Sequence, residues 1–213
     1  ADGMGGHAMG DEAATTVIRA LASLTQARHP IDRHNIADAL SEANATIIGL
    51  AQKLGKTCGS TVAGIYLNQC QALVFWAGDS RVYRFREKQI KRLTRDHSLV
   101  QELADAGVLN NEQARTHHQA HVITRAIGVA DCPQVEFAEL PIEAGDVYLV
   151  CSDGLSSMID DGMLASILGS SLVRAADELV RAALGAGGMD NISLVLIAVD
   201  CAPGALSNGG SWN

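Results

Sequence analysis

Aromatic residues and prolines are scarce in this sequence. Phe, Trp and Tyr together make up 4% of the 213 residues, and there are 4 prolines, although 47% of the residues are hydrophobic. A core formed by such a chain has to consist mainly of small aliphatic side chains. The length and the apolar fraction are typical of one compact globular domain.

The cysteines give no sign of a disulfide or zinc framework. There are 5 of them, an odd number, and no two form a C-x-x-C pair. Cys151 and Cys201 lie in or beside apolar runs, where buried free thiols are common, and free thiols are typical of the reducing cytosol. No apolar run approaches the ~18 residues that a membrane-spanning helix needs, and no signal peptide pattern is present. We therefore expect a cytoplasmic protein with no membrane partner.

Acidic residues outnumber basic ones. The formal net charge is -8 and the sequence pI is about 5.3. Such a surface repels nucleic acid and anionic membranes, so neither is expected as a partner. Carboxylates that gather at one place repel each other unless a cation lies between them. The sequence therefore has to be searched for aspartates that converge.

Helical and strand patterns occur in blocks. Apolar residues at helical spacing predict helices over 11–27, 34–54, 96–107, 155–169 and 172–187. Short β-branched or aromatic runs between turn residues predict strands over 60–68, 72–78, 81–89, 135–142, 146–152 and 191–200. The polar stretch 108–121 has weak periodicity and is expected to form a mobile loop or flap.

This order of elements is not a strict alternation of strands and helices. It favours antiparallel strands covered by helices, an α+β fold, over a doubly wound parallel sheet. No internal repeat or linker divides the chain, so one domain is expected over residues 1–200. Residues 201–213 are rich in Gly, Ser and Asn and are expected to form a disordered tail.

Four aspartates stand at the ends of predicted elements. Asp2 precedes three glycines within four residues, Asp96 opens a helical pattern, Asp153 follows a buried strand, and Asp190 opens the last strand. Taken singly, each is most simply a turn residue, a helix cap or a loop residue. Together they supply the oxygen ligands that Mg²⁺ or Mn²⁺ prefers, which predicts a hard-cation site.

Seven short motifs occur in an order that resembles a known family. They are ADGMGGH, GSTVAG, AGDSRVYRFR, LTRDHSLVQEL, ITRAIG, CSDGL and DNISLVLI. In this order they resemble the type 2C, or PPM, metal-dependent serine/threonine protein phosphatases, and the bacterial members most of all. The resemblance runs from Ala1 to about Val199.

The resemblance implies an architecture that periodicity alone does not reveal. It is a four-layer α-β-β-α sandwich, in which two antiparallel sheets are flanked by helices. The family's first strands, which carry an Arg and a Glu-Asp pair, have no counterpart in this sequence. The catalytic domain is therefore expected to be incomplete at its N-terminal side.

The resemblance also implies roles for the aspartates. Asp2 would bridge two metal ions, and the carbonyl of Gly3 would bind the second ion. Asp153 and Asp190 would complete the protein ligands of the first ion. Asp96, with Asp153, would hold a third and weaker ion.

The implied reaction is hydrolysis of phosphoserine and phosphothreonine on proteins, in opposition to a cognate Ser/Thr kinase. Two cations, Mn²⁺ or Mg²⁺, would activate a water molecule that attacks phosphorus. No covalent intermediate is needed, so no Cys or Ser nucleophile is expected.

Other polar residues in the motifs have less certain roles. For His7, a packing or hydrogen-bonding role is favoured, and a catalytic role stays open. Arg125 is expected to help position phosphate or the flap, and Asp79 to be a structural turn residue. Three histidines of the flap have no usual zinc spacing and are expected to be solvated: His117, His118 and His121.

Two alternatives remain from the sequence. One is a related phosphatase branch that acts on regulators of transcription or sporulation, in which the last motif more often has two adjacent aspartates; Asp190-Asn191 argues against it. The other is a non-catalytic binding or regulatory domain that has kept the fold and lost the chemistry. The four aspartates argue against it, whereas the missing upstream Glu leaves it open.

Overall fold

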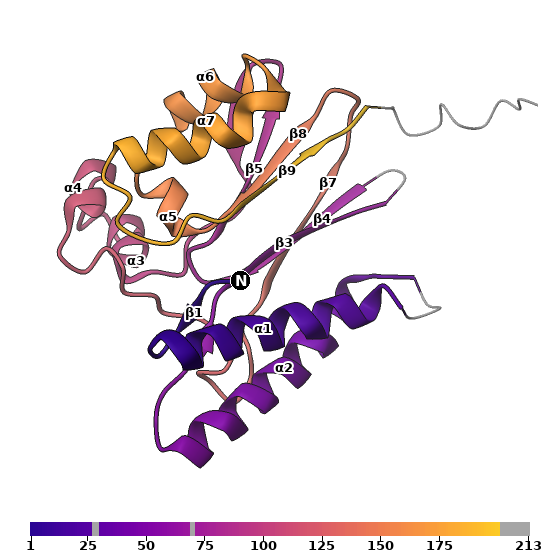
Figure 1. The fold of residues 1–213 in the computed structure, drawn as a ribbon, viewed down its shortest axis with the longest axis vertical. Coiled ribbons are helices and arrows are strands. Elements are labelled where there is room, and N and C mark those ends of the chain that lie inside the picture. Colours follow the sequence, from indigo (N-terminus) through magenta and orange to yellow (C-terminus); the bar gives the residue numbers. More distant parts are fainter. Residues whose placement is uncertain (27–29, 69–70, 201–213) are drawn as a thin grey trace, which may run out of the picture.

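Two antiparallel sheets form the centre of the molecule in the computed structural model, which describes residues 1–26, 30–68 and 71–200. One sheet has the strand order β3 (Val62–Leu67), β4 (Gln71–Ala77), β7 (Glu136–Pro141). The other has the order β6 (Gln89–Arg92), β5 (Arg81–Arg86), β8 (Val147–Cys151), β9 (Leu194–Ala198). A short ribbon of β1 (Gly3–Met4) and β2 (Gly59–Ser60) lies at one end (Figure 1).

The two sheets pack face to face through alternate side chains. Val74 and Trp76 of β4 and Val82 of β5 form a buried cluster with Val150 of β8. Because successive side chains of a strand point to opposite faces, the intervening residues of these strands are left to face the outer helices. The sequence alternation of each strand therefore builds two apolar layers at once.

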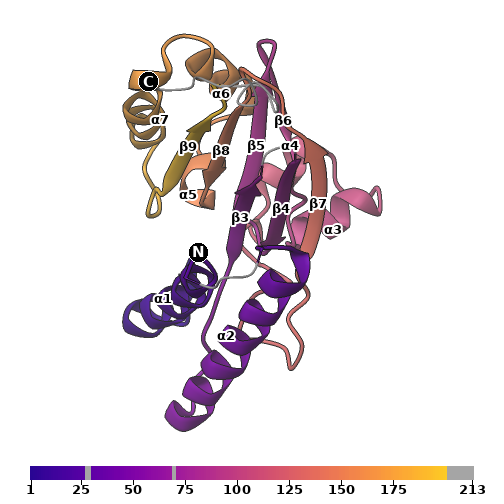
Figure 2. The ribbon, with the colours of Figure 1, turned by 90° about the vertical axis from the view of Figure 1, so that its right-hand side faces the viewer.

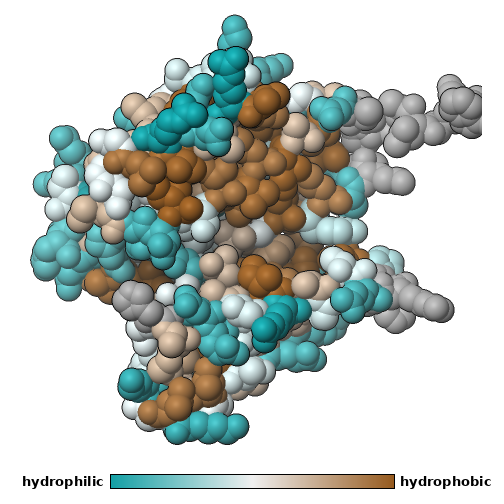
Figure 3. All heavy atoms as spheres, viewed as in Figure 1, coloured by the Kyte–Doolittle hydropathy of each residue, from teal (hydrophilic) through white to brown (hydrophobic). Residues whose placement is uncertain are grey.

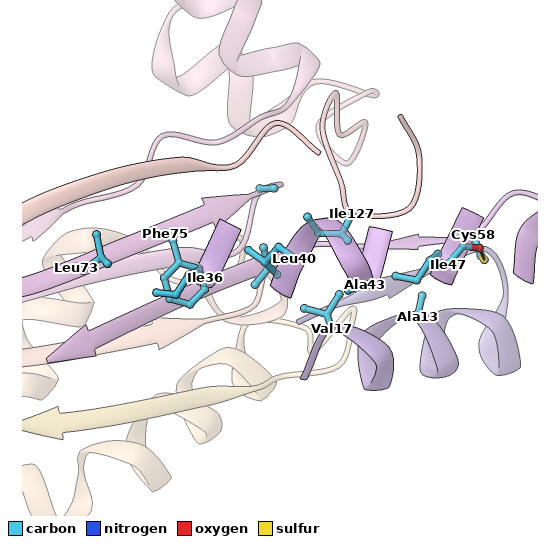
Figure 4. Packing of buried hydrophobic residues seen from close by; sticks show 12 residues of the cluster. Ala13, Val17, Ile36, Leu40, Ala43, Ile47, Cys58, Leu73, Phe75 and Ile127 are labelled. Atoms are coloured by element: carbon cyan, nitrogen blue, oxygen red, sulfur yellow. Dashed lines mark hydrogen bonds between the residues drawn. The ribbon is translucent and has the colours of Figure 1, made fainter. Parts of the chain in front are cut away.

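A helix pair covers the outer face of the β3-β4-β7 sheet. The helices are α1 (His7–Leu24) and α2 (Arg33–Leu54), and Figure 4 shows their side chains beside the sheet. Val17, Ile36 and Leu40 are at most 1% exposed and cluster with Leu73 and Phe75 of β4. The sequence fixes both ends of α2, since the Asp32 carboxylate accepts a hydrogen bond from the Asn35 amide and Gly55 adopts a left-handed conformation after Leu54.

A second helical layer covers the β6-β5-β8-β9 sheet. It consists of α5 (Asp153–Ser156), α6 (Asp161–Leu168) and α7 (Leu172–Gly185), and it lies on the side away from α1 and α2 (Figure 2). Leu164 and Leu179 are fully buried against Tyr83 and Leu149. The predicted four-layer α-β-β-α architecture is confirmed.

The predicted flap is more ordered than its composition indicates. It follows α3 (Leu99–Asp105) and contains a further helix, α4 (Asn111–Thr116). Asn110 and Gln113 exchange side-chain and backbone hydrogen bonds in a capping box, which satisfies backbone donors that periodicity does not reveal. The expectation of a plain loop over 108–121 is therefore wrong for residues 111–116.

The predicted strand over 81–89 is a hairpin. Glu87 and Lys88 both have positive φ angles, 49° and 63°, and they turn the chain from β5 into β6. The end of β9 also falls at the limit of the described residues, so the predicted tail over 201–213 lies outside them.

Two sheet edges lie on one side of the molecule. Within the described residues, β3 and β9 each pair on one side only, and they approach each other in Figure 1. Figure 3 shows apolar side chains gathered on the face that bears α7 and β9, and Val195 of β9 is 57% exposed. No described helix is both long and apolar enough to span a membrane.

Candidate metal centre

Three of the predicted aspartates meet where β1, β8 and β9 end or begin. Cys151 of β8 pairs with Leu194 of β9, so Asp153 just after β8 and Asp190 just before β9 belong to neighbouring loops. Asp2 immediately precedes β1. The register of β8 and β9 thus brings Asp153 and Asp190 to the same region, and the charges of both act on Asp2.

Close backbone contact fixes Asp153 beside the loop of Asp190. A Cβ atom on Gly154 would lie 2.2 Å from the carbonyl oxygen of Asn191, so only glycine permits this approach. The Ser152 hydroxyl donates to the same carbonyl at 3.2 Å and accepts from the Ser193 amide at 3.1 Å. The Ser-Asp-Gly motif therefore sets the distance between two of the carboxylates.

Thr61 holds the backbone of Asp2 from both sides. The Asp2 amide donates to the Thr61 hydroxyl at 3.0 Å, and the Thr61 amide donates to the Asp2 carbonyl at 2.8 Å. The Thr61 hydroxyl also lies 2.9 Å from the Ser80 hydroxyl, and both residues are buried. The motifs that contain Thr61 and Ser80 act as the support of Asp2, a role that sequence reasoning did not assign to them.

Burial and neighbouring negative charge both disfavour ionisation of two of these carboxylates. Burial, followed by the charges of Asp153 and Asp190, raises the pKa of Asp2. Burial and then the charge of Asp190 raise the pKa of Asp153. The Oδ1 atom of Asp153 is buried without a hydrogen-bond partner, which is costly for a charged oxygen.

The donor set fits a hard divalent cation. Carboxylate oxygens and a nearby carbonyl are the ligands that Mg²⁺ and Mn²⁺ take, often with water in the remaining positions. Among the described residues, no three His, Cys, Asp or Glu side chains are gathered closely enough to hold an ion as they stand. The case for a cation at these residues therefore rests on two observations: negative charges lie near one another, and one oxygen of Asp153 is buried without a partner.

Asp96 is already paired with a cation of the protein. Its carboxylate accepts from the Arg81 guanidinium at 2.6 Å (Nη2) and 3.0 Å (Nε), and Arg92 lies 3.6 Å away. Asp96 is 8% exposed, so this is a largely buried pair. A third ion at Asp96 would share the carboxylate with Arg81, a competition that the motif alone does not reveal.

Asp79 belongs to the same electrostatic cluster. Burial, together with the charges of Asp153, Asp96 and Asp2, raises the pKa of Asp79 to about 7. The sequence indicates only a turn residue here, because no local pattern tells which distant carboxylates a turn will face. Asp79 is therefore an acid of this region whose pKa is strongly raised and which the sequence did not identify as part of the site.

Arg125 contacts protein groups. Its guanidinium donates to Glu136 at 2.8 Å, and Glu136 lies 3.1 Å from Nε2 of His97. The Nδ1 atom of His97 accepts from the Gly78 amide at 3.2 Å. This chain of contacts links Arg125 to the turn that bears Asp79, so Arg125 has a positioning role in the structure, and its predicted role toward phosphate stays a prediction.

The predicted histidines separate into different environments. His7 is the first residue of α1, and its side chain lies outside what the structure describes. His117 and His118 have ring centroids 4.5 Å apart. His121 is exposed, yet its Nδ1 atom lies 3.9 Å from Asp153. His121 is solvated as expected, and its approach to Asp153 is a contact that the sequence does not indicate.

A family model described as protein phosphatase 2C matches residues 1–187. The chain belongs to the protein phosphatase 2C family. It is 36% identical over 208 residues to the protein phosphatase PhpP of Streptococcus pneumoniae, covering 94% of this chain and 84% of PhpP. The serine/threonine phosphatase stp of Listeria monocytogenes is 32% identical over 209 residues, covering 94% of this chain and 83% of stp.

Solved structures of this family superpose closely on the chain. The serine/threonine phosphatase PstP/Ppp of Mycobacterium tuberculosis gives a TM-score of 0.87 at 32% identity, covering 94% of this chain and 86% of that one. A PstP catalytic domain in complex with 2 manganese ions gives 0.82 at 32% identity, covering 93% and 85%. These findings confirm the predicted family, its fold and its class, the metal-dependent serine/threonine protein phosphatases.

Replacing Gly154 with alanine tests how the carboxylates are brought together. Because the new methyl group would collide with the Asn191 carbonyl, Gly154→Ala should move the Asp190 loop away and weaken Mn²⁺ binding by about tenfold or more. Calorimetric titration with Mn²⁺ measures the affinity. Gly185→Ala is the control, since its methyl group meets nothing within 4 Å. Equal Mn²⁺ affinity of wild type and Gly154→Ala would contradict this account of the site.

The raised pKa of Asp79 predicts a pH-dependent gain on removing its charge. A carboxyl group whose folded-state pKa is raised stabilises the fold below about pH 4 and loses that contribution as the pH rises through about 7. In EDTA, the free energy of unfolding of Asp79→Asn should therefore exceed that of wild type at pH 8 by up to a few kcal/mol. The difference between the two proteins should shrink at pH 5. Urea unfolding at both pH values measures it. Asp177→Asn, an exposed change on α7, is the control. If Asp79→Asn differed from wild type by the same free energy at both pH values, the prediction would be refuted.

Proposed function

We propose that Asp2, Asp153 and Asp190, with the carbonyl of Gly3, hold two divalent cations, and that the chain hydrolyses phosphoserine and phosphothreonine in proteins. The observation that carries this proposal is the unpaired, buried oxygen of Asp153, beside carboxylates whose charges raise the pKa of Asp2 and of Asp153. Family membership supports metal-dependent chemistry in general. The choice of these ligands, and of Mn²⁺ or Mg²⁺, belongs to the proposal.

Cations held by these residues would supply positive charge that lowers the pKa of water and neutralises phosphoryl oxygens. The protein contributes positioning. Thr61 fixes the backbone of Asp2, and Gly154 and Ser152 fix the spacing of the other two carboxylates. Rigid placement matters because the groups that stabilise a transition state act best when they need no rearrangement.

A cavity gives a phosphorylated side chain access to Asp153. Its volume is about 460 Å³, and Asp79, Asp96 and Asp153 line it together with residues of α3, α4 and α6. A phosphate group that enters beside Asp153 would meet the cations held there. His121 stands at the same wall and would contact the arriving substrate.

The relatives guide the biological setting that we propose. PhpP is named a protein phosphatase and stp a serine/threonine phosphatase, so we propose phosphoproteins as the substrate class and a Ser/Thr kinase that phosphorylates them as the opposing enzyme. Two described cysteines, Cys58 and Cys151, are buried free thiols, in keeping with the cytoplasmic location that we propose.

Removal of metal tests the proposed chemistry. Mn²⁺ should support hydrolysis of a small aryl phosphate and of a phosphothreonine peptide, and excess EDTA should abolish both. Asp153→Asn should lower kcat/KM about a hundredfold or more, because it removes a charged ligand that stabilises the transition state. Asp131→Asn, an exposed change outside the lining of the cavity, is the control. A well-folded wild type that binds Mn²⁺ without turnover would favour the non-catalytic alternative.

The third ion has its own test. We propose that Asp96 and Asp153 bind it weakly, in competition with Arg81. Asp96→Asn keeps a hydrogen-bond acceptor for Arg81 but removes the charge, so it should reduce the number of Mn²⁺ ions bound at millimolar concentration from three to two. Elemental analysis after equilibrium dialysis gives the count. The same count for wild type and Asp96→Asn would remove Asp96 from the ligands.

A further inference from the structure

The cavity beside Asp153 extends well beyond the carboxylate cluster. It reaches from Asp153 between the α3-α4 segment and the start of α6, where Asp160, Asp161 and Gly162 line it. A phosphoryl group needs only the end at Asp153. The remaining volume is available to a neighbouring part of the substrate.

Part of the lining of this cavity is apolar. Val100 and Ala104 from α3, Ala114 from α4 and Ile159 before α6 contribute to its lining. Val100 and Ile159 are 9% and 4% exposed, so they form part of a packed wall. Such a wall accommodates methylene groups and gives no hydrogen bonds to a polar chain.

The far rim of the cavity is acidic. Asp160 and Asp161 are both exposed there. Asp160 accepts a hydrogen bond from the Met163 amide as the N-cap of α6, and both carboxylates stay in contact with solvent. On the α4 side, Arg115 contributes one positive charge, while Arg81 deeper in the cavity is already paired with Asp96. The rim therefore has more negative than positive charge, in a chain whose net charge is -8.

We propose that this groove binds an arginine or lysine side chain of the substrate polypeptide, close in sequence to the phosphorylated residue. Arginine and lysine have an apolar stem and a cationic head. The stem would lie along Val100, Ala104 and Ile159, and the head would reach Asp160 and Asp161. This inference rests on the proposed function and adds a sequence preference to it: phosphoserine or phosphothreonine flanked by basic residues.

Synthetic peptides test the preference. In a phosphothreonine peptide, one Arg is placed in turn at each of the three positions on either side of the phosphoresidue, with Ala and Glu peptides for comparison. At one position at least, kcat/KM for the Arg peptide should exceed that for the Ala peptide about three- to tenfold, as expected for one or two solvent-exposed ion pairs. The preference should shrink at high salt, because exposed charges are screened.

The double variant Asp160→Asn, Asp161→Asn locates the effect. Asparagine keeps the N-cap of α6, so folding is preserved, and the ratio of Arg to Ala peptide should fall to about one. Asp177→Asn on α7 removes a charge outside the groove and should leave the ratio as in wild type. A ratio that survives in the double variant, or a preference for the Glu peptide, would overturn the proposal.

Failure of this inference is distinguishable from failure of the proposed function. If the enzyme hydrolysed a small aryl phosphate but acted on the Arg and Ala peptides at equal rates, the phosphatase function would stand. The proposal that the groove binds a basic side chain would then be refuted. Binding of the same peptides to Asp153→Asn, measured by fluorescence anisotropy, supplies the Arg-to-Ala ratio without turnover. Equal affinities there would refute the groove even if no peptide were hydrolysed.

Discussion

The site depends on one constraint: carboxylates that repel each other are held together by backbone contacts. The charges of Asp153 and Asp190 oppose ionisation of Asp2, the charge of Asp190 opposes ionisation of Asp153, and Oδ1 of Asp153 is buried with no hydrogen-bond partner. Gathering uncompensated negative charge costs folding free energy. A divalent cation bound there, as we propose, would relieve that cost, so cation binding and the local order of these loops would be coupled.

The restraints that oppose this repulsion are hydrogen bonds between uncharged groups. Hydrogen bonds of Thr61 with Asp2, and of Ser152 with Asn191 and Ser193, connect loops through backbone groups. The loops in turn leave strands that are buried between sheet and helices, where Tyr83 and Leu149 are fully buried. The apolar layers therefore supply the stability that allows an electrostatically unfavourable cluster to persist.

The sequence predicts the strands, the long helices and the identity of the converging aspartates. Periodicity finds α2 to within about a residue because Asp32 and Gly55 mark its ends, and the ordered motifs supply the layered architecture. Contacts between distant segments are what sequence reasoning missed: the pairing of Asp96 with Arg81, the exposure of Asp79 to other carboxylates, and the approach of His121 to Asp153. Each depends on where two loops meet, and the local pattern of neither loop encodes that meeting.

The residues that we propose for the chemistry and the residues that we propose for substrate choice belong to different parts of the structure. The carboxylates stand on loops fixed by the sheets, whereas the far wall of the groove comes from α4 and from the first turn of α6, which no hydrogen bond described above connects to Asp2, Asp153 or Asp190. Changes at Asp160, Asp161 or Arg115 would alter the charge that a substrate meets while the spacing set by Gly154 stays the same. Since the rim charges are exposed, each contributes little by itself. A preference of this kind ranks substrates by their flanking charge, and the reaction on the phosphoryl group remains the same for all of them.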